Sequence, residues 1–205
     1  MKRVLLIVAV IVFGSYYLLA DDFINDPNLE REVRETINTQ CEHQVKAFTN
    51  HLAFIAKKEN PDSIKDYHIE ACMDLFVGRG DNTLDKEGNV IIPAPRIEVT
   101  SVTRQTKNSY FIRKYLERLK GLQYSKIVFK SSKCYIADGG IKEIEKGSGE
   151  YVATVSFYQV FQGYKGDLLV YKDKTEKRVT VHIKRNASGN FTISLGDVKA
   201  DNCPT

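Results

Sequence analysis

The sequence predicts an α+β fold in which an N-terminal helical hairpin and a third helix pack on a curved antiparallel β-meander. Two observations predict this class. In three stretches before Gly121, apolar residues recur every three or four positions, which is typical of amphipathic helices. After Gly121 the apolar period becomes two, which is typical of strands with one buried face. No internal repeat or low-complexity tract interrupts this order, so residues 21–205 are expected to form one domain.

The N-terminal segment has the layout of an export signal. Lys2-Arg3 precedes an uncharged run over residues 4–20, and Asp21 follows, so residues 1–20 predict a secretory signal peptide with Ala20 before the cleavage point. An uncleaved signal anchor remains open, because the run is nearly as long as a bilayer span of about 20 residues. Both alternatives place the rest of the chain outside the cytoplasm, because the positive residues stay inside. We therefore expect a periplasmic or secreted protein, either free or anchored by this segment.

Two helices are expected first. Asp26-Pro27 is typical of an N-cap followed by a first-turn proline, Asn60-Pro61 separates two apolar stripes, and Gly78 is a natural stop for the second helix. The stripes consist of Leu29, Val33, Ile37, Cys41, Val45, Phe48, Leu52 and Ile55, and then of Ile64, Tyr67, Ala71, Cys72, Leu75 and Phe76.

The middle of the chain is expected to hold a polar loop, an extended segment and a third helix. Residues 79–89 are polar, and residues 90–104 contain two prolines that limit an extended segment to a sheet edge or a bend. Asn108 or Ser109 can cap the third helix. Its apolar positions are Phe111, Ile112, Tyr115, Leu116, Leu119 and Leu122.

The last part of the chain predicts an antiparallel meander. Residues 123–137 hold one or two short strands, and residues 149–164, 177–184 and 190–198 each read as a strand. Residues 164–176 fit either a hairpin arm or a long loop. The inward-facing positions of the last two strands are Val179, Val181 and Ile183, and then Phe191, Ile193 and Leu195, while Gly139-Gly140 is an expected turn.

The strand over residues 149–164 carries apolar groups on both faces. Phe157 and Phe161 are expected on the inner face, and Gln159 is the strongly polar residue among them. Tyr158 and Val160 then lie on the outer face and are candidates for a partner surface or a homodimer contact. The alternative is that Tyr158 is a half-exposed tyrosine with its hydroxyl in water.

This order of elements over residues 27–198 resembles the nuclear transport factor 2-like fold, also called cystatin-like or ketosteroid isomerase-like. The resemblance implies a cone-like sheet that encloses a pocket together with the helices. The candidate pocket residues are Tyr67, Tyr115, Phe157, Gln159 and Phe161. Isomerases and dehydratases of that fold use a buried acid or histidine as a base, and no inner-face strand position with an acid or histidine can be identified here. That absence favours binding over catalysis.

The four cysteines are candidates for disulfides, because an even count in an exported chain favours them. Three pairings are open, of which Cys41 with Cys72 and Cys134 with Cys203 would each tie neighbouring segments. Four buried free thiols are the alternative. No C-x-x-C pair supports a zinc site.

Charge and motifs exclude several classes of function. The net charge is +4 and the basic residues are spread among acidic ones, so nucleic-acid binding is not indicated. The histidines have no metal-ligand spacing, and the sequence has no G-x-S-x-G, P-loop or G-x-G-x-x-G motif. We therefore expect neither a metal nor a cofactor.

The sequence predicts an exported, non-catalytic domain that binds a small apolar ligand or a protein partner in the cell envelope. Two alternatives remain open. One is a ketosteroid isomerase-like enzyme that acts on small molecules. The other is a membrane-tethered scaffold, which resembles the periplasmic scaffold subunit of type IV secretion systems.

Overall fold

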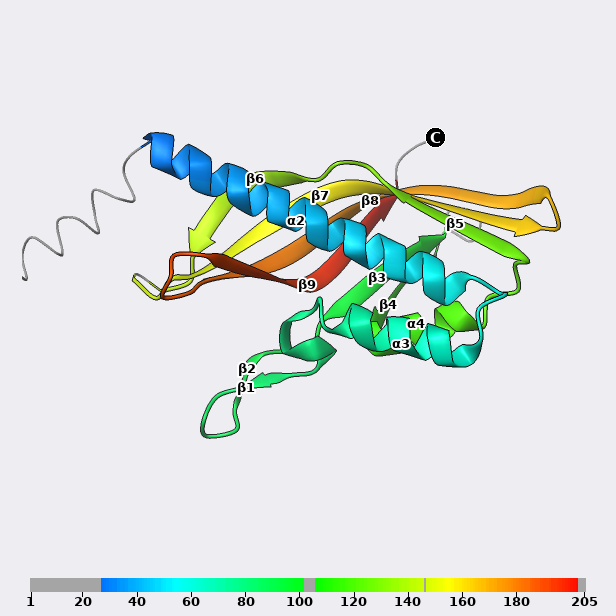
Figure 1. Ribbon diagram of the computed structural model, residues 1–205, viewed down its shortest axis with the longest axis horizontal. Coiled ribbons are helices and arrows are strands. Elements are labelled where there is room, and N and C mark those ends of the chain that lie inside the picture. The colour runs from blue at the N-terminus through cyan, green and yellow to red at the C-terminus, as the bar shows by residue number, and fades with distance from the viewer. Residues whose placement is uncertain (1–26, 102–105, 146, 203–205) are drawn as a thin grey trace, which may run out of the picture. The chain divides into compact units, whose positions relative to one another are not determined.

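The computed structural model describes residues 27–101, 106–145 and 147–202 (Figure 1). The chain divides into two units, residues 1–37 and residues 38–205. The described part of the first unit is the beginning of helix α2, and the second unit holds the remaining elements. The predicted signal segment lies outside the described residues. No helix in the described ranges is both long and apolar enough to cross a membrane.

Two helices come first, as predicted. Helix α2 spans Pro27–Ala56 and helix α3 spans Asp62–Met73. The prediction that the second helix continues to Gly78 was wrong. The chain turns after Met73 because Leu75 turns its carbonyl toward the sheet, where it accepts a hydrogen bond from the backbone N–H of Leu195 at 2.8 Å. A short 3₁₀ turn, η1 (Val77–Gly80), follows.

The third helix begins later than predicted. Asn108 and Ser109 do not cap it, because both lie in strand β4 (Thr106–Phe111), which pairs antiparallel with β3 (Arg96–Ser101). Helix α4 (Ile112–Lys120) starts directly after this strand. The expected polar loop contains β1 (Thr83–Leu84), which forms a small hairpin with β2 (Val90–Ile92) at the start of the segment expected to be extended.

Five further strands complete the meander. They are β5 (Lys126–Ser131), β6 (Tyr135–Glu143), β7 (Glu150–Lys165), β8 (Leu168–Arg185) and β9 (Phe191–Asn202). The expected turn at Gly139-Gly140 is not a separate turn, because both residues lie inside β6. The pairing of β6 with β7 is irregular between Ile136 and Ile141, on either side of these glycines. Of the two alternatives for residues 164–176, the hairpin arm is correct, because most of this segment belongs to β8.

The large sheet is mixed and mostly antiparallel. Its order is β4-β3-β9-β8-β7-β5, and β6 pairs with the other part of the same edge of β7. Only β3 and β9 run parallel among the described strands. The core is formed by the buried apolar faces of the helices and the long strands, including Phe48, Leu116, Phe157, Val181 and Leu195. The predicted α+β class, with three helices packed on a meander, is confirmed.

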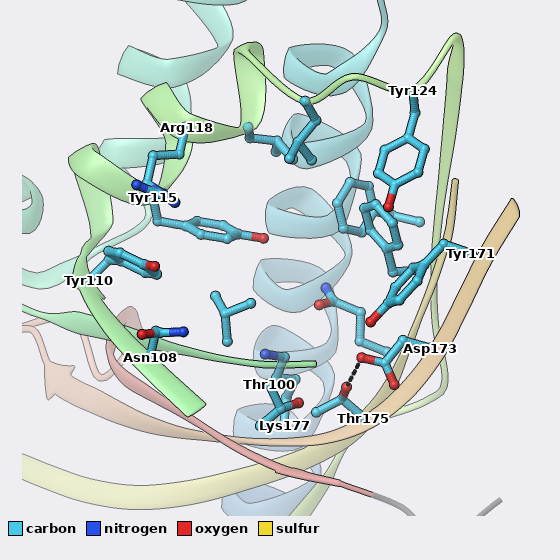
Figure 2. A pocket seen from close by; sticks show the side chains of 16 residues that line it. Thr100, Asn108, Tyr110, Tyr115, Arg118, Tyr124, Tyr171, Asp173, Thr175 and Lys177 are labelled. Carbon is cyan, nitrogen blue, oxygen red and sulfur yellow. Dashed lines mark hydrogen bonds between the residues drawn. The ribbon is translucent and has the colours of Figure 1, made fainter. Parts of the chain in front are cut away.

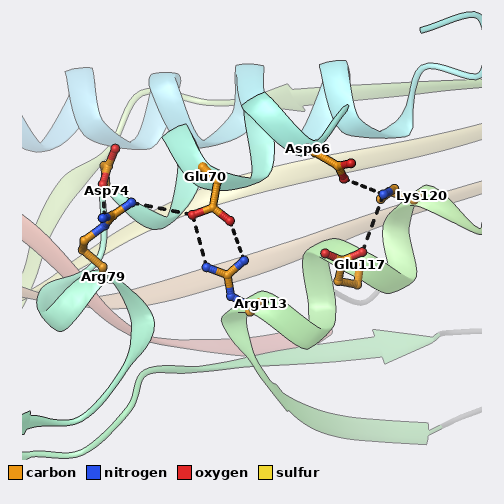
Figure 3. Close-up of polar contacts among 7 residues, drawn as sticks. All are labelled: Asp66, Glu70, Asp74, Arg79, Arg113, Glu117 and Lys120. Atoms are coloured by element: carbon orange, nitrogen blue, oxygen red, sulfur yellow. Dashed lines mark hydrogen bonds and ion pairs between the residues drawn. The ribbon is translucent and has the colours of Figure 1, made fainter. Parts of the chain in front are cut away.

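Ion pairs link α3 to α4 (Figure 3). The guanidinium of Arg113 forms two hydrogen bonds with the Glu70 carboxylate, at 2.6 and 3.2 Å, and Lys120 contacts Asp66 at 2.6 Å. The hydrogen bond from Arg113 lowers the pKa of the Glu70 carboxyl. Exposed pairs of this kind add little stability individually, but two of them along one helix fix where α4 lies.

The described cysteines are free and buried. No disulfide joins Cys41 to Cys72, so that predicted pairing is absent from the structure, and Cys134 is also a free thiol. Burial raises the pKa of Cys41 and Cys72 to about 12 and that of Cys134 to about 11, which keeps them neutral. Cys203 lies outside the described residues.

Candidate functional site

A cavity of about 440 Å³ lies between helix α4, the β3–β4 pair and the inner face of β5, β7 and β8 (Figure 2). All of these elements belong to the unit of residues 38–205. The lining residues are Val99, Thr100, Asn108, Tyr110, Tyr115, Arg118, Leu119, Leu122, Tyr124, Phe129, Gln159, Phe161, Tyr171, Asp173, Thr175 and Lys177. The volume is within the range of about 300–1,000 Å³ that is usual for small-molecule sites.

One wall of the cavity is aromatic. Phe161 of β7 lies at its centre, with its ring centroid 5.3 Å from that of Phe129 and 5.7 Å from those of Tyr124 and Tyr171. The three contacts are edge-on, which is a favourable geometry for aromatic pairs. Such a wall offers flat apolar surface to a ring-shaped ligand.

The floor of the cavity is polar although it is buried. Asp173, Thr175 and Lys177 occupy alternate positions of β8 and therefore share one face of the strand. Gln159 of β7 is the strand-pairing partner of Thr175, and Thr100 contributes from β3. All five residues are only 6–7 % exposed. Polar side chains are rarely buried to this degree without a specific role.

Two hydrogen bonds order part of this floor. The Thr175 hydroxyl donates to Asp173 Oδ2 at 3.3 Å, as Figure 2 shows. Lys177 Nζ donates to the backbone carbonyl oxygen of Glu98 at 2.9 Å. The lysine head is thereby held at the β3 side of the floor.

Three buried side-chain atoms of the floor have no hydrogen-bond partner among the described residues. They are Thr100 Oγ1, Gln159 Nε2 and Asp173 Oδ1. Leaving a buried polar atom without a partner costs about 1–3 kcal/mol, so nearly all such atoms in proteins are satisfied. A donor, an acceptor and a hydroxyl are thus available together at one end of an aromatic cavity.

Burial also changes the ionisation of Lys177. Desolvation lowers its pKa from 10.5 to about 8, although the carboxylates of Asp173 and Glu98 act in the opposite direction. The floor therefore holds an ammonium group that loses its proton far more readily than an exposed lysine does. Its charge and that of Asp173 offset each other, which favours a ligand head without net charge.

The wall opposite the strands is formed by α4 and β4. The Arg118 guanidinium lies over the ring of Tyr110, 4.8 Å from its centroid. Figure 2 shows the hydroxyl of Tyr115 pointing toward the middle of the cavity. Burial raises the pKa of this hydroxyl, so it stays protonated and can donate a hydrogen bond.

The structure brings three of the five predicted pocket residues together. Tyr115, Gln159 and Phe161 line the cavity. Phe157 is fully buried in the core and is not among the lining residues. Tyr67 is 66 % exposed on α3, so its predicted place in a pocket was wrong; it faces solvent beside the ring of His68.

The two candidates for a partner surface, Tyr158 and Val160, are both in β7. Tyr158 is partly exposed, with Lys174 Nζ 4.6 Å from its ring centroid, and Val160 is half-buried. That this surface meets a partner or a second copy remains a prediction.

The sequence-based statement that no acid lies on an inner strand face was wrong. Asp173 is such an acid, Thr175 and Lys177 share its face of β8, and a signal for all three exists in the sequence. Like Val179 and Ile183, they occupy odd-numbered positions. Extending the strand predicted over residues 177–184 toward its N-terminal end therefore places them on the same inner face. The signal was missed because a loop remained an alternative for residues 164–176.

Two histidines of the helices contact each other away from the cavity. His51 Nδ1 and His68 Nδ1 lie 3.0 Å apart, and desolvation lowers the pKa of both rings. Within the described ranges, no group of three or more histidine, cysteine or acidic side chains is arranged to hold a metal ion.

Comparison with solved structures finds similar chains at low identity. A scytalone dehydratase-like protein from Novosphingobium aromaticivorans is 12% identical, with a TM-score of 0.43, over 86% of this chain and 87% of its own. A chain of the C. albicans Mtr2–Mex67 M domain complex is 14% identical, with a TM-score of 0.36, over 81% of this chain and 96% of its own. No model of a protein family and no curated protein matches the sequence.

The element order described above is the one that the resemblance to the nuclear transport factor 2-like fold implied. Fold alone does not define chemistry, so the function has to be argued from the cavity.

Proposed function

We propose that residues 38–205 form a binding domain for a small, flat, amphipathic molecule that occupies this cavity. The observation that carries the proposal is a set of three polar atoms without a partner in the described ranges, at one end of an aromatic chamber: Thr100 Oγ1, Gln159 Nε2 and Asp173 Oδ1. A ligand head would provide the hydrogen bonds that the described residues do not provide.

The chemistry of the floor defines the class of ligand. Gln159 offers a donor, Asp173 an acceptor and Thr100 both, so the ligand head should donate and accept. A neutral hydroxyl or primary amide fits this requirement, because Asp173 and Lys177 already offset each other's charge. The body of the ligand should be aromatic, since Phe161 and its neighbouring rings present flat apolar surface.

Calorimetry with 2-naphthol tests this proposal. Thr100→Val and Gln159→Leu each remove a polar group without adding charge. We expect each to weaken 2-naphthol binding about fivefold to tenfold, because each loses one hydrogen bond to the ligand. Naphthalene, which lacks the hydroxyl, should bind both variants and the wild type equally.

Thr83→Val is the matched control. Thr83 Oγ1 is also buried without a hydrogen-bond partner in the described part of the chain, but Thr83 does not line the cavity. This variant should bind 2-naphthol normally. If 2-naphthol does not bind, or if the cavity variants weaken 2-naphthol and naphthalene equally, the proposal fails.

A second candidate function is proton-transfer catalysis with Asp173 as the base. The observation that favours it is that Asp173 Oδ1, which has no hydrogen-bond partner among the residues that the structure describes, lies in an aromatic cavity that also holds the Tyr115 hydroxyl. The probe 5-nitrobenzisoxazole tests it. A base removes the C3 proton, the N–O bond breaks, and a cyanophenolate forms with its characteristic absorbance. Turnover that Asp173→Asn abolishes would make catalysis the leading function, and turnover at the solvent rate would exclude this role.

We further propose that the domain acts outside the cytoplasm, on the basis of the charge pattern of residues 1–22. Mass spectrometry of the N-terminus of the protein from its host tests this. Asp21 as the first residue would support a cleaved signal peptide, and Met1 on a membrane-bound protein would support the anchored scaffold alternative.

A further inference from the structure

The hairpin between β7 and β8 ends in an exposed apolar tip. A glycine turn at Gly166 (φ 59°) is followed by three consecutive aliphatic residues, Leu168, Leu169 and Val170, all of which are exposed. Leu168 is 69 % exposed. We call residues 164–170 the β7–β8 tip. Contiguous exposed apolar residues of this kind indicate a contact surface.

Lysines surround the β7–β8 tip. Lys165 lies within it and Lys172 follows it along the chain, and Lys126 of the neighbouring strand β5 is paired with Tyr164, with Lys126 Nζ 5.4 Å from the tyrosine ring centroid. All three lysines are exposed. Asp167 is the acidic residue within the tip, so the immediate surroundings are basic.

The hairpin of β1 and β2 provides a contrast. It also exposes aliphatic residues, including Val90 and Ile91. Its loop, however, carries Asp85 and Glu87 and the single lysine Lys86, and is therefore acidic overall. Apolar exposure alone does not distinguish the two hairpins, but the sign of the flanking charge does.

We infer that the β7–β8 tip docks on an anionic lipid bilayer. Leu168, Leu169 and Val170 enter the interfacial region, and the lysines lie at the level of the phosphates. Tyr164 at the base of the tip suits this depth, because tyrosine prefers the membrane interface. The combination of an apolar insertion with flanking lysines is the usual composition of surface-bound segments.

The placement of the tip relates it to the cavity. Tyr171, which lines the cavity, follows Val170 directly in β8. A docked tip would therefore hold the aromatic wall close to the bilayer, where amphipathic ring compounds partition. The docking itself does not depend on the proposed ligand.

A tryptophan reporter tests the inference on the full chain, which has no tryptophan of its own. In Leu169→Trp, the emission should shift to the blue with phosphatidylcholine–phosphatidylglycerol vesicles, and brominated lipid should quench it. Pure phosphatidylcholine should give little change. Adding Lys165→Gln or Lys172→Gln should weaken the vesicle titration about fivefold for each lysine removed.

The matched control is Ile91→Trp, which places the same reporter on the exposed acidic hairpin. This reporter should not shift, even if another part of the chain attaches the protein to the vesicles. The inference is overturned if Leu169→Trp does not respond, if both reporters respond alike, or if the response is independent of anionic lipid. A shift that depends on protein concentration without vesicles would instead identify a second copy of the chain as the occupant.

Discussion

Strand β8 has two halves that differ sharply in chemistry on the same face. Toward the hairpin tip, the inward positions are Asp173, Thr175 and Lys177. Farther along they are Val179, Val181 and Ile183. All six side chains are buried. Burial alone therefore does not decide which residue type occupies an inner position.

What lies opposite each half explains the difference. The apolar half faces the closely packed core, where no polar atom is needed. The polar half faces the cavity, where Thr100 and Gln159 also present polar atoms that have no partner within residues 27–101, 106–145 and 147–202. Burying these atoms weakens folding, because no hydrogen bond within the described residues replaces the hydration that they lose. Buried polar residues along an otherwise apolar strand face are thus the clearest indication of a site in this chain.

The largest effect is expected from truncating the apolar half. Ile183→Ala should lower the free energy of unfolding by about 2–5 kcal/mol, because it leaves a void in the core. Binding of 2-naphthol should remain unchanged, since Ile183 does not line the cavity. Urea unfolding measures the loss, and Ile144→Ala at an exposed position is the control. A loss no larger than that of the control would contradict the assignment of this half to the core.

Removing both charges of the polar half should stabilise the protein, in contrast to Ile183→Ala. Asp173→Leu combined with Lys177→Met should raise the free energy of unfolding at pH 7 by about 1–4 kcal/mol, because both desolvated charges disappear. Each single variant should be less stable than the double variant, because it leaves one buried charge without its counterpart.

The pH dependence of stability should identify Lys177 as a source of this cost. Its pKa is lowered from 10.5 to about 8 in the folded protein, so the unfolded state binds more protons between these values and wild-type stability rises across that window. The double variant should lack this rise. Urea unfolding of both proteins at pH 7, 9 and 11 measures it, and a constant difference between them would show that Lys177 is not perturbed.

A reciprocal exchange of threonine and valine gives an intermediate effect. Val179→Thr should cost about 1–3 kcal/mol, because it places a hydroxyl among apolar side chains. Thr100→Val should be neutral or stabilising, because the hydroxyl that it removes has no partner among the described residues. Thermal unfolding of the two variants measures both changes. Equal losses of stability in the two variants would contradict the distinction between an apolar core at Val179 and a polar cavity at Thr100.

A modest loss of stability is expected at Gly163 in the cavity half of β7. A Cβ atom at this position would lie 2.6 Å from ring carbons of Tyr124, so Gly163→Ala should displace that ring from the aromatic wall. Tyr124 is half-buried and can move outward, so the cost should be about 1 kcal/mol. Calorimetry should show weaker binding of 2-naphthol and of naphthalene alike, because the wall contacts both. Unchanged affinity would place the ligand away from Tyr124.

Much of the fold could be predicted from the sequence. The stripe from Cys41 to Ile55 indicated α2, and the alternation around Val179 and Val181 indicated the inner face of β8, because these periods follow from local geometry. The errors arose where long-range contacts override local preference. Ser109 can cap a helix, but pairing with Glu98 of β3 holds it in a strand. Leu75 has a helical spacing, but a hydrogen bond to Leu195 draws its backbone to the sheet.

The site was less predictable than the fold. Tyr115, Gln159 and Phe161 could be identified because each lies on an apolar side of its helix or strand. Tyr67 was misplaced because an apolar stripe on a helix does not show which of its residues reach solvent. Cavity-lining groups come from β3, β4, α4, β5, β7 and β8, and only folding brings these segments together.

The sequence by itself determined the class of the domain, the helical period of its first part and the alternation of its last strands, since each depends on neighbours along the chain. The tertiary structure alone decided that Asp173 and Lys177 share a chamber with Thr100 and Gln159, and that Thr100 Oγ1, Gln159 Nε2 and Asp173 Oδ1 have no hydrogen-bond partner among the described residues. The physical reason is that hydrogen-bond satisfaction and desolvation depend on atoms that are distant in sequence, and no local pattern records which atoms those will be.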